Sequence, residues 1–344
     1  MEYLPDDKTL MERKLLGKGL TAPSMAVLLC YSKALLKEQI LASDVPEDSY
    51  MNQFLIQSFP KPLQKKYSKQ MQHHPLKREI IATKLANIIV NEMGFTYVYR
   101  LQDETAAPVS AIVRAYMTTR SVLNLESIWK QIEALGSKID AQKQTELMVL
   151  YIRLCRRMTR WFIRAQRVPA DMTQLTEVYT KGVAELKKSM PDVFGPVNKT
   201  KYEEHFMSRI DEGIPPELAH ELTVTRGLFA AADIVEIALS REMKIAKVAQ
   251  LYFLIGGFLD LPWLRTQVII HPAENHWEAL SREALRNDLD WQQRQLTDGL
   301  INFKGKKIDP ETLISSWGSL HGPLITRWRL TLADLRASAN LNYI

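Results

Sequence analysis

Cysteine is scarce in this sequence, and several features that would restrict its class are missing. The 344 residues include only two cysteines, Cys30 and Cys155, which form no CxxC pair and indicate no disulfide framework. The longest apolar run, 251–259, is interrupted by Gly256 and Gly257 and is far shorter than the roughly 18 residues that span a bilayer. The N-terminus, MEYLPDD, lacks the apolar core of a secretory signal. We therefore expect a cytoplasmic protein that does not bind a membrane.

Motifs that carry catalytic chemistry are also missing. The sequence contains no GxSxG elbow, no phosphate-binding loop and no HExxH, so hydrolase, nucleotidase and zinc-protease mechanisms have no anchor in it. The segment GKGLTA at 17–22 has the spacing of a dinucleotide fingerprint, but no β-branched strand precedes it. Thr21 as an N-cap and Pro23 in the first helical turn explain this segment instead.

The histidine pairs are weak candidates for a metal site. His73 and His74 are adjacent, so their side chains diverge on a helix, and no third ligand is spaced for them. His271 and His276 flank a short loop without cysteine support. The mixed charges of 282–290 are typical of a salt-bridged helix surface rather than an acid–base pair. We therefore expect no catalytic, cofactor-binding or metal-binding residue, and no cofactor, in this chain.

Helical periodicity dominates what is present. In the segment 77–93, apolar residues fill one broad arc at 100° per residue, and Gly94 is placed to end the helix in a left-handed conformation. Hydrophobic residues make up 46% of the chain and charged residues 24%, as in ordinary globular proteins. Only the run Phe95 to Val98 has strand character. The sequence predicts an all-α, multi-helix fold with no sheet of more than two short strands.

The same patterns predict two helical halves. The segment 191–201, PDVFGPVNKTK, is the best candidate linker, and it separates an N-terminal half, 1–190, from a C-terminal half, 202–344. Overlaying 109–132 on 245–268 aligns Tyr116 with Tyr252 and a shared L-(N/D)-L break. An internal duplication would explain this match, and the general likeness of amphipathic helix pairs is the alternative.

Basic residues are concentrated in two places. Residues 61–84 and 153–167 together carry a net charge of +12, so the rest of the chain is near −6 and the total of +6 is not spread evenly. The second segment lies on a long helix predicted over 141–166, where its arginines fall within a sector of about 100°. These arginines are Arg153, Arg156, Arg157, Arg160, Arg164 and Arg167.

This arginine stripe has three interpretations. It is a solvated helix face, a surface that docks on an acidic part of another domain or subunit, or a nucleic-acid site. Nucleic acid is the least favoured partner, because the stripe has no interleaved exposed aromatic residues. We predict an inter-domain contact as its functional role.

Several segments spread along the chain resemble one family. They include YLPDDKTLMERKLLGKGLTAPSMAVLLCYSK (3–33), REIIATKLANIIVNEMG (78–94), FTYVYRLQDET (95–105), GIPPELA (213–219), AADIVEIA (231–238) and NHWEALSREALRNDLDWQQRQL (275–296). Together these colinear segments resemble the C-terminal helical region of the large bacterial NAD-dependent glutamate dehydrogenases. One departure is Ser24, where the family has an acidic residue in the first turn of the helix.

The resemblance implies that this chain is a C-terminal segment of a larger enzyme, with both ends cut. That enzyme oxidatively deaminates L-glutamate to 2-oxoglutarate and ammonia with NAD, and its nucleotide-binding fold and substrate lysine lie outside this chain. The resemblance therefore implies a non-catalytic, structural or regulatory role for this chain. Its expected partner is the catalytic domain of the same polypeptide, and the full enzyme is expected to be a homo-oligomer. The alternative is a free-standing helical interaction module that binds RNA through the arginine stripe.

Overall fold

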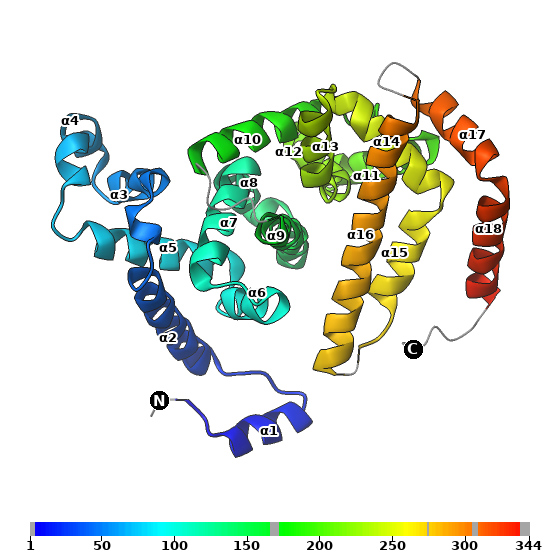
Figure 1. Ribbon diagram of the computed structural model, residues 1–344. Coiled ribbons are helices and arrows are strands. Elements are labelled where there is room, and N and C mark those ends of the chain that lie inside the picture. The colour runs from blue at the N-terminus through cyan, green and yellow to red at the C-terminus, as the bar shows by residue number, and fades with distance from the viewer. Residues whose placement is uncertain (1–3, 166–171, 274, 305–308, 338–344) are drawn as a thin grey trace. The chain divides into compact units, whose positions relative to one another are not determined.

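Helices form nearly all of the described structure. The computed structural model describes residues 4–165, 172–273, 275–304 and 309–337 (Figure 1). Over these ranges it contains eighteen α-helices, three short 3-10 helices and no strand, so the predicted all-α class is confirmed. The run Phe95 to Val98 is not a strand, since Phe95 lies in a turn and α6 begins at Tyr97.

The chain divides into two compact units, Met1–Val122 with Cys155–Glu177, and Leu123–Leu154 with Val178–Ile344. The helices of the first unit are α1 (Asp7–Leu15), α2 (Ala22–Leu41), α3 (Asn52–Gln57), α4 (Lys61–Gln72), α5 (Lys77–Met93), α6 (Tyr97–Thr105) and α7 (Val109–Val122), with the 3-10 helices η1 (Val45–Glu47) and η2 (Ser49–Met51). The second holds α8 (Leu125–Glu133), η3 (Gly136–Lys138), α11 (Pro196–Asp211), α12 (Pro216–Leu228), α13 (Ala231–Arg241), α14 (Ile245–Phe258), α15 (Leu261–Ile270), α16 (His276–Lys304), α17 (Pro310–Leu320) and α18 (Gly322–Ala337). Two helices, α9 (Ala141–Arg164) and α10 (Met172–Ser189), contribute to both units.

These units are not the halves that the sequence predicts. The first unit takes the C-terminal part of α9, because Met158 and Phe162 are buried and Thr159 joins a hydrogen-bonded core with residues of α6 and α7. Part of the predicted linker 191–201 is helical, since α11 begins at Pro196. The division at 191–201 stays a prediction.

Helix α5 is the core helix of the first unit. Its buried residues are Ile81, Ala82, Leu85, Ala86, Ile89, Val90 and Met93, close to the predicted apolar arc. It packs against α2 and α3. Gly94 ends the helix with φ +88° and ψ 161°, so the positive φ is as predicted but the extended ψ is not that of a left-handed helical residue.

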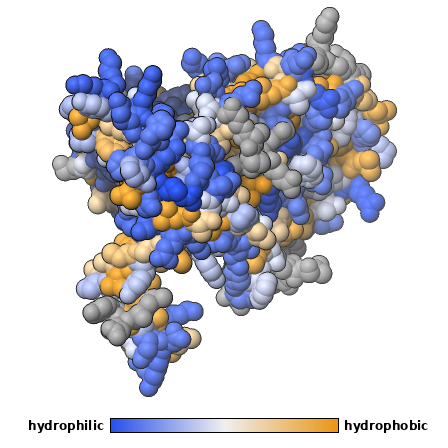
Figure 2. All heavy atoms as spheres, turned by 60° about the vertical axis from the view of Figure 1, so that its left-hand side comes forward, coloured by the Kyte–Doolittle hydropathy of each residue, from blue (hydrophilic) through white to orange (hydrophobic). Residues whose placement is uncertain are grey.

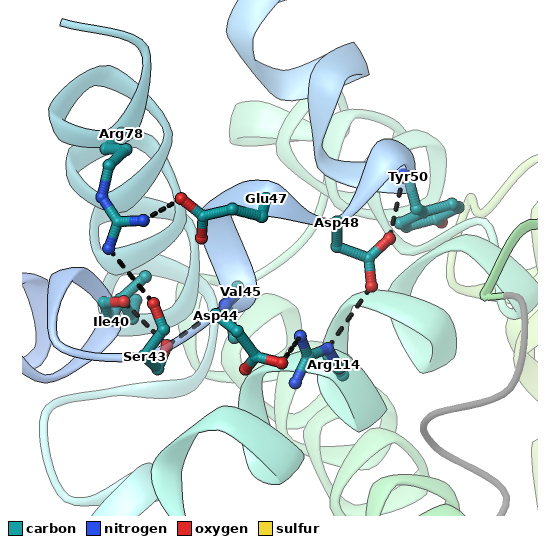
Figure 3. Close-up of polar contacts among 9 residues, drawn as sticks. All are labelled: Ile40, Ser43, Asp44, Val45, Glu47, Asp48, Tyr50, Arg78 and Arg114. Atoms are coloured by element: carbon teal, nitrogen blue, oxygen red, sulfur yellow. Dashed lines mark hydrogen bonds and ion pairs between the residues drawn. The ribbon is translucent and has the colours of Figure 1, made fainter.

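Two arginines fix the corner that follows α2 (Figure 3). Arg78 of α5 pairs with Glu47 of η1 and donates to the Leu41 carbonyl at 2.5 Å. Arg114 of α7 lies 3.1 Å from Asp44 and 3.4 Å from Asp48. The guanidinium groups therefore connect η1 and its neighbours to α5 and α7, and the Arg114 side chain is only 12% exposed.

Helix α14 is the corresponding core helix of the second unit, and it packs against α13, α15, α16 and α17. Gly256 of α14 faces Gln293 of α16, whose Nε2 donates to the Tyr252 carbonyl at 2.7 Å. Asp309 caps α17 by accepting from the Thr312 amide at 3.2 Å, and Pro310 is the first residue of the helix.

The two helix pairs that align in sequence have matching local geometry. Helices α7 and α14 each contain 14 residues. The residues before α8 and α15, Asn124 and Asp260, are left-handed with φ of 51° and 54°. Ala106 and Glu242, which end α6 and α13, share this conformation with φ of 54° and 51°. The predicted duplication remains a prediction, and these paired positions support it.

Helices α14 and α15 also bear on the question of membrane spans. Among the described residues, no single helix is long and apolar enough to cross a membrane. Helices α14 and α15 reach the required length and composition only as a pair, across a bend of 71°.

Candidate functional site

Two arginines of the predicted stripe form ion pairs inside the first unit. Arg160 is 2% exposed and its Nη2 donates to Glu104 Oε2 at 2.6 Å, while Arg156 pairs with the other oxygen of the same carboxylate. Glu104 belongs to α6, so these contacts join α6 to α9. We refer to Glu104, Arg156 and Arg160 as the glutamate–arginine cluster. Arg160 is therefore not part of a solvated face.

The other arginines of the stripe differ in exposure. Arg153 and Arg164 are exposed and Arg157 is half-buried, whereas Arg167 lies outside the described residues. A nucleic-acid platform needs adjacent accessible cations along the strand. Because Arg160 is buried and Arg156 faces Glu104, the structure does not present the stripe as one such row. The inter-domain role of the stripe stays a prediction.

A polar network in the core of the first unit was not predicted from the sequence. Glu92 accepts hydrogen bonds from Tyr116 Oη at 2.6 Å and from Arg120 Nε at 2.9 Å. Tyr97 Oη donates to Thr159 Oγ1 at 2.9 Å. From the sequence, Tyr116 is considered only for its alignment with Tyr252. The sequence feature that could have indicated this network is the presence of the charged residues Glu92 and Arg120 beside apolar helix faces.

Burial explains the large pKa shifts of three groups in the first unit. Desolvation raises the pKa of Tyr97, of Tyr116 and of the Cys155 thiol well above their usual values, and the nearby Glu92 carboxylate raises those of Tyr116 and Cys155 further. These three side chains are 4%, 0% and 0% exposed. Shifted pKa values often mark catalytic groups, but here they belong to groups enclosed by packed helices.

A cationic pocket lies within the second unit, between α9, α11 and α12. Its volume is about 240 Å³. The basic residues that line it are Lys143, Arg153, His205, Arg209 and Arg226, and the acidic ones are Glu146 and Glu212. Lys143 Nζ lies 2.9 Å from Glu212 Oε1. The lining thus keeps an excess of positive charge. Of its basic residues, the predicted arginine stripe included only Arg153.

The adjacent histidines His73 and His74 contact backbone groups close to them in sequence. A ring nitrogen of His73 lies 2.9 Å from the Lys69 carbonyl, and His74 Nδ1 accepts from the Leu76 amide at 3.1 Å. Over the ranges that the structure describes, no group of three or more His, Cys, Asp or Glu residues is arranged to hold a metal ion.

Apolar side chains are exposed at the N-terminal end of the first unit. Helix α1 has no buried residue, and Leu15 and Leu16 are 80% and 68% exposed. Tyr31 and Leu35 of α2 are also exposed. The space-filling view shows apolar side chains among polar ones on the projecting part at the lower left (Figure 2). We refer to Leu10, Met11, Leu15, Leu16, Tyr31 and Leu35 as the N-terminal apolar surface.

Comparisons with known proteins agree along the whole chain. Residues 17–344 match the family described as "Glutamate dehydrogenase, C-terminal". The chain is 36% identical over 343 residues to the NAD-specific glutamate dehydrogenase of Pseudomonas aeruginosa and 34% identical over 335 residues to that of Halomonas elongata. It is 28% identical over 338 residues to the Mycobacterium tuberculosis protein of the same name. These alignments cover 97–100% of this chain but only 21% of each relative.

Proposed function

Because the chain belongs to the family of glutamate dehydrogenase C-terminal domains, we propose that it is the C-terminal helical domain of an NAD-dependent glutamate dehydrogenase. That enzyme would oxidise L-glutamate to 2-oxoglutarate and ammonia. The observation that carries the proposal is the colinear match of 97–100% of this chain to three NAD-specific glutamate dehydrogenases.

We propose further that the domain supports or regulates catalysis rather than performing it. Hydride transfer requires a site that holds the nicotinamide against the substrate carbon. Tyr97, Tyr116 and Cys155, whose pKa values are strongly raised, lie in the helical core, where a substrate cannot reach them. The NAD site and the reacting residues would then lie in the part of the polypeptide outside this chain.

The N-terminal apolar surface is the contact that we propose for the catalytic part. An exposed apolar patch on a protein is typically covered by a partner. About four fifths of each relative lies outside the region that matches this chain, so a partner within the same polypeptide is available. The exposed Arg164 of the same unit would add a charge-dependent contact, and the full enzyme would assemble as a homo-oligomer.

Two measurements test these proposals. The isolated chain should show no glutamate-dependent reduction of NAD, and measurable turnover would refute the non-catalytic role. In a full-length enzyme that contains this chain, Leu15→Glu with Leu16→Glu should lower activity or change the oligomer size, because it places charge on the proposed contact. The matched control is Leu330→Glu, at an exposed leucine of α18. Equal behaviour of the two variants would refute the docking surface while leaving the family assignment intact.

A further inference from the structure

The cationic pocket of the second unit carries an inference beyond the proposed function. Arg209 is the innermost of its guanidinium groups, and its Nη1 donates to the Thr223 hydroxyl at 2.5 Å. That hydroxyl in turn donates to the Ala219 carbonyl at 2.6 Å. Arg209 is therefore held by a neutral group on α12 and points its charge toward the same space as Arg153 and Arg226.

The two acids of this space neutralise only part of its positive charge, although Glu212 acts on Arg209 as well as on Lys143. Glu212 pairs with Lys143, and Glu146 accepts from Gln142 at 3.3 Å. Within the part of the chain that the structure describes, Arg153 and Arg226 make no hydrogen bond or ion pair. Guanidinium groups that outnumber the nearby acids repel one another, and an anion that contacts them relieves this repulsion.

We propose that this pocket is a binding site for a phosphoryl oxyanion, held by Arg153, Arg209 and Arg226. Guanidinium forks match the oxygens of phosphate and carboxylate groups, and such charge-assisted hydrogen bonds are about twice as strong as neutral ones. A volume of about 240 Å³ is below the usual range of roughly 300–1,000 Å³ for drug-sized ligands. The ligand is therefore a small phosphate compound or the phosphate group of a larger one.

His205 supplies an internal reporter for the site. Its pKa is lowered first by burial and then by the charges of Arg226 and Arg209, and Lys201 acts in the same direction while Glu204 opposes it. The charged groups of α9 and α11 that share the pocket with His205 are Lys143, Glu146, Arg153, Arg209 and Glu212. A dianion beside these groups favours the imidazolium, so binding raises the His205 pKa. By linkage, the affinity for the anion rises as pH falls through that pKa.

Titration of the 344-residue chain with inorganic phosphate tests the proposal. We expect saturable binding by calorimetry at about millimolar Kd or tighter, weakened by added sodium chloride. Arg153→Gln and Arg226→Gln should each weaken binding about tenfold to a hundredfold, since each removes one charge-assisted contact. The matched control is Arg100→Gln, which removes an exposed arginine of α6 and should leave the affinity unchanged.

The NMR titration of His205 separates binding at this site from binding elsewhere. Saturating phosphate should raise the His205 pKa in the unchanged chain and in the Arg100→Gln variant, but not in the double variant Arg153→Gln with Arg226→Gln. Succinate serves as a dicarboxylate comparison and should bind more weakly, because its two charges are held apart whereas the guanidinium groups line one small cavity. Unchanged affinity in both arginine variants, or a His205 pKa that does not respond to phosphate, would overturn the proposed site. A preference for succinate would overturn its assignment to phosphoryl groups. None of these results depends on the catalytic role of the parent enzyme.

Discussion

Replacing Glu104 by glutamine tests whether the glutamate–arginine cluster holds α6 against α9. The side chains of Glu104 and Arg160 are only 9% and 3% exposed, so both charges are largely removed from water. Removing the carboxylate that both arginines share weakens the compensation of the buried Arg160 charge, and losing one partner of a buried ion pair costs up to about 3–5 kcal/mol. We expect Glu104→Gln to lower the free energy of unfolding by about 3 kcal/mol, the low end of that range, because Arg156 is 23% exposed and stays partly hydrated. Such a loss is a large share of the roughly 5–15 kcal/mol that stabilises a typical protein.

The assay is urea unfolding followed by circular dichroism, with Arg160→Met and the double variant completing a mutant cycle. The double variant should be more stable than the sum of the two single losses predicts, because it removes the buried Arg160 charge together with its Glu104 partner. Glu126→Gln is the matched control, since Glu126 and Lys130 form a pair at 2.6 Å whose side chains are 47% and 70% exposed. This control should lose less than about 1 kcal/mol. Equal losses for Glu104→Gln and Glu126→Gln would refute the reasoning.

Three further predictions concern packing, capping and pH. In Gly182→Ala, the new Cβ would lie 2.7 Å from Cγ1 of Val235. We therefore expect the free energy of unfolding, measured by thermal unfolding, to fall by about 1–3 kcal/mol, although alanine usually favours a helix. Adding Val235→Ala should restore part of this loss. Thr21→Ala removes the side-chain cap of α2, which accepts from the Ser24 amide at 3.3 Å, and should cost about 1 kcal/mol by urea unfolding, whereas Thr21→Asn should be neutral. Hydrogen bonding to Arg241 lowers the pKa of Asp298 below its ordinary value of 3.8, so the stabilisation is complete above that value and is lost as pH falls through the lowered pKa. The free energy of unfolding should therefore differ less between pH 6 and pH 3 for Asp298→Asn than for the unchanged chain. The same difference in both proteins would contradict the stabilising role of the Asp298–Arg241 pair.

Local features of the fold were predictable because their causes are local. The helix over 77–93 follows from its apolar arc, and its end follows from Gly94. The caps at Thr21 and Asp309 lie within three residues of the amides that they accept from. Interactions of this kind depend on neighbouring residues in sequence, so one sequence is enough to find them.

The candidate sites could be predicted only in part from the sequence, because they are formed by residues that lie far apart in it. The helical periodicity places Arg153 and Arg160 on the same helix face and does not distinguish between them. Their different environments depend on Glu104, which lies 56 residues before Arg160 and faces it across α6 and α9. The cationic pocket likewise joins α9 to Arg209 and Arg226 of two later helices. The sequence therefore indicated a basic helix face but not which arginines are buried, paired or gathered in a cavity.

The path of α9 through both compact units has a consequence for synthesis of the chain on the ribosome. The first unit is interrupted in sequence, because Leu123–Leu154 belong to the second unit and Cys155–Glu177 return to the first. Domains that are continuous in sequence can fold in turn as they emerge. Here Met158 and Phe162, which are buried in the first unit, emerge only after α8 and the first turns of α9 have been made. The N-terminal helices must therefore wait for these residues with part of their apolar surface uncovered, and a nascent chain arrested before residue 155 should be a better chaperone substrate than one arrested after 177.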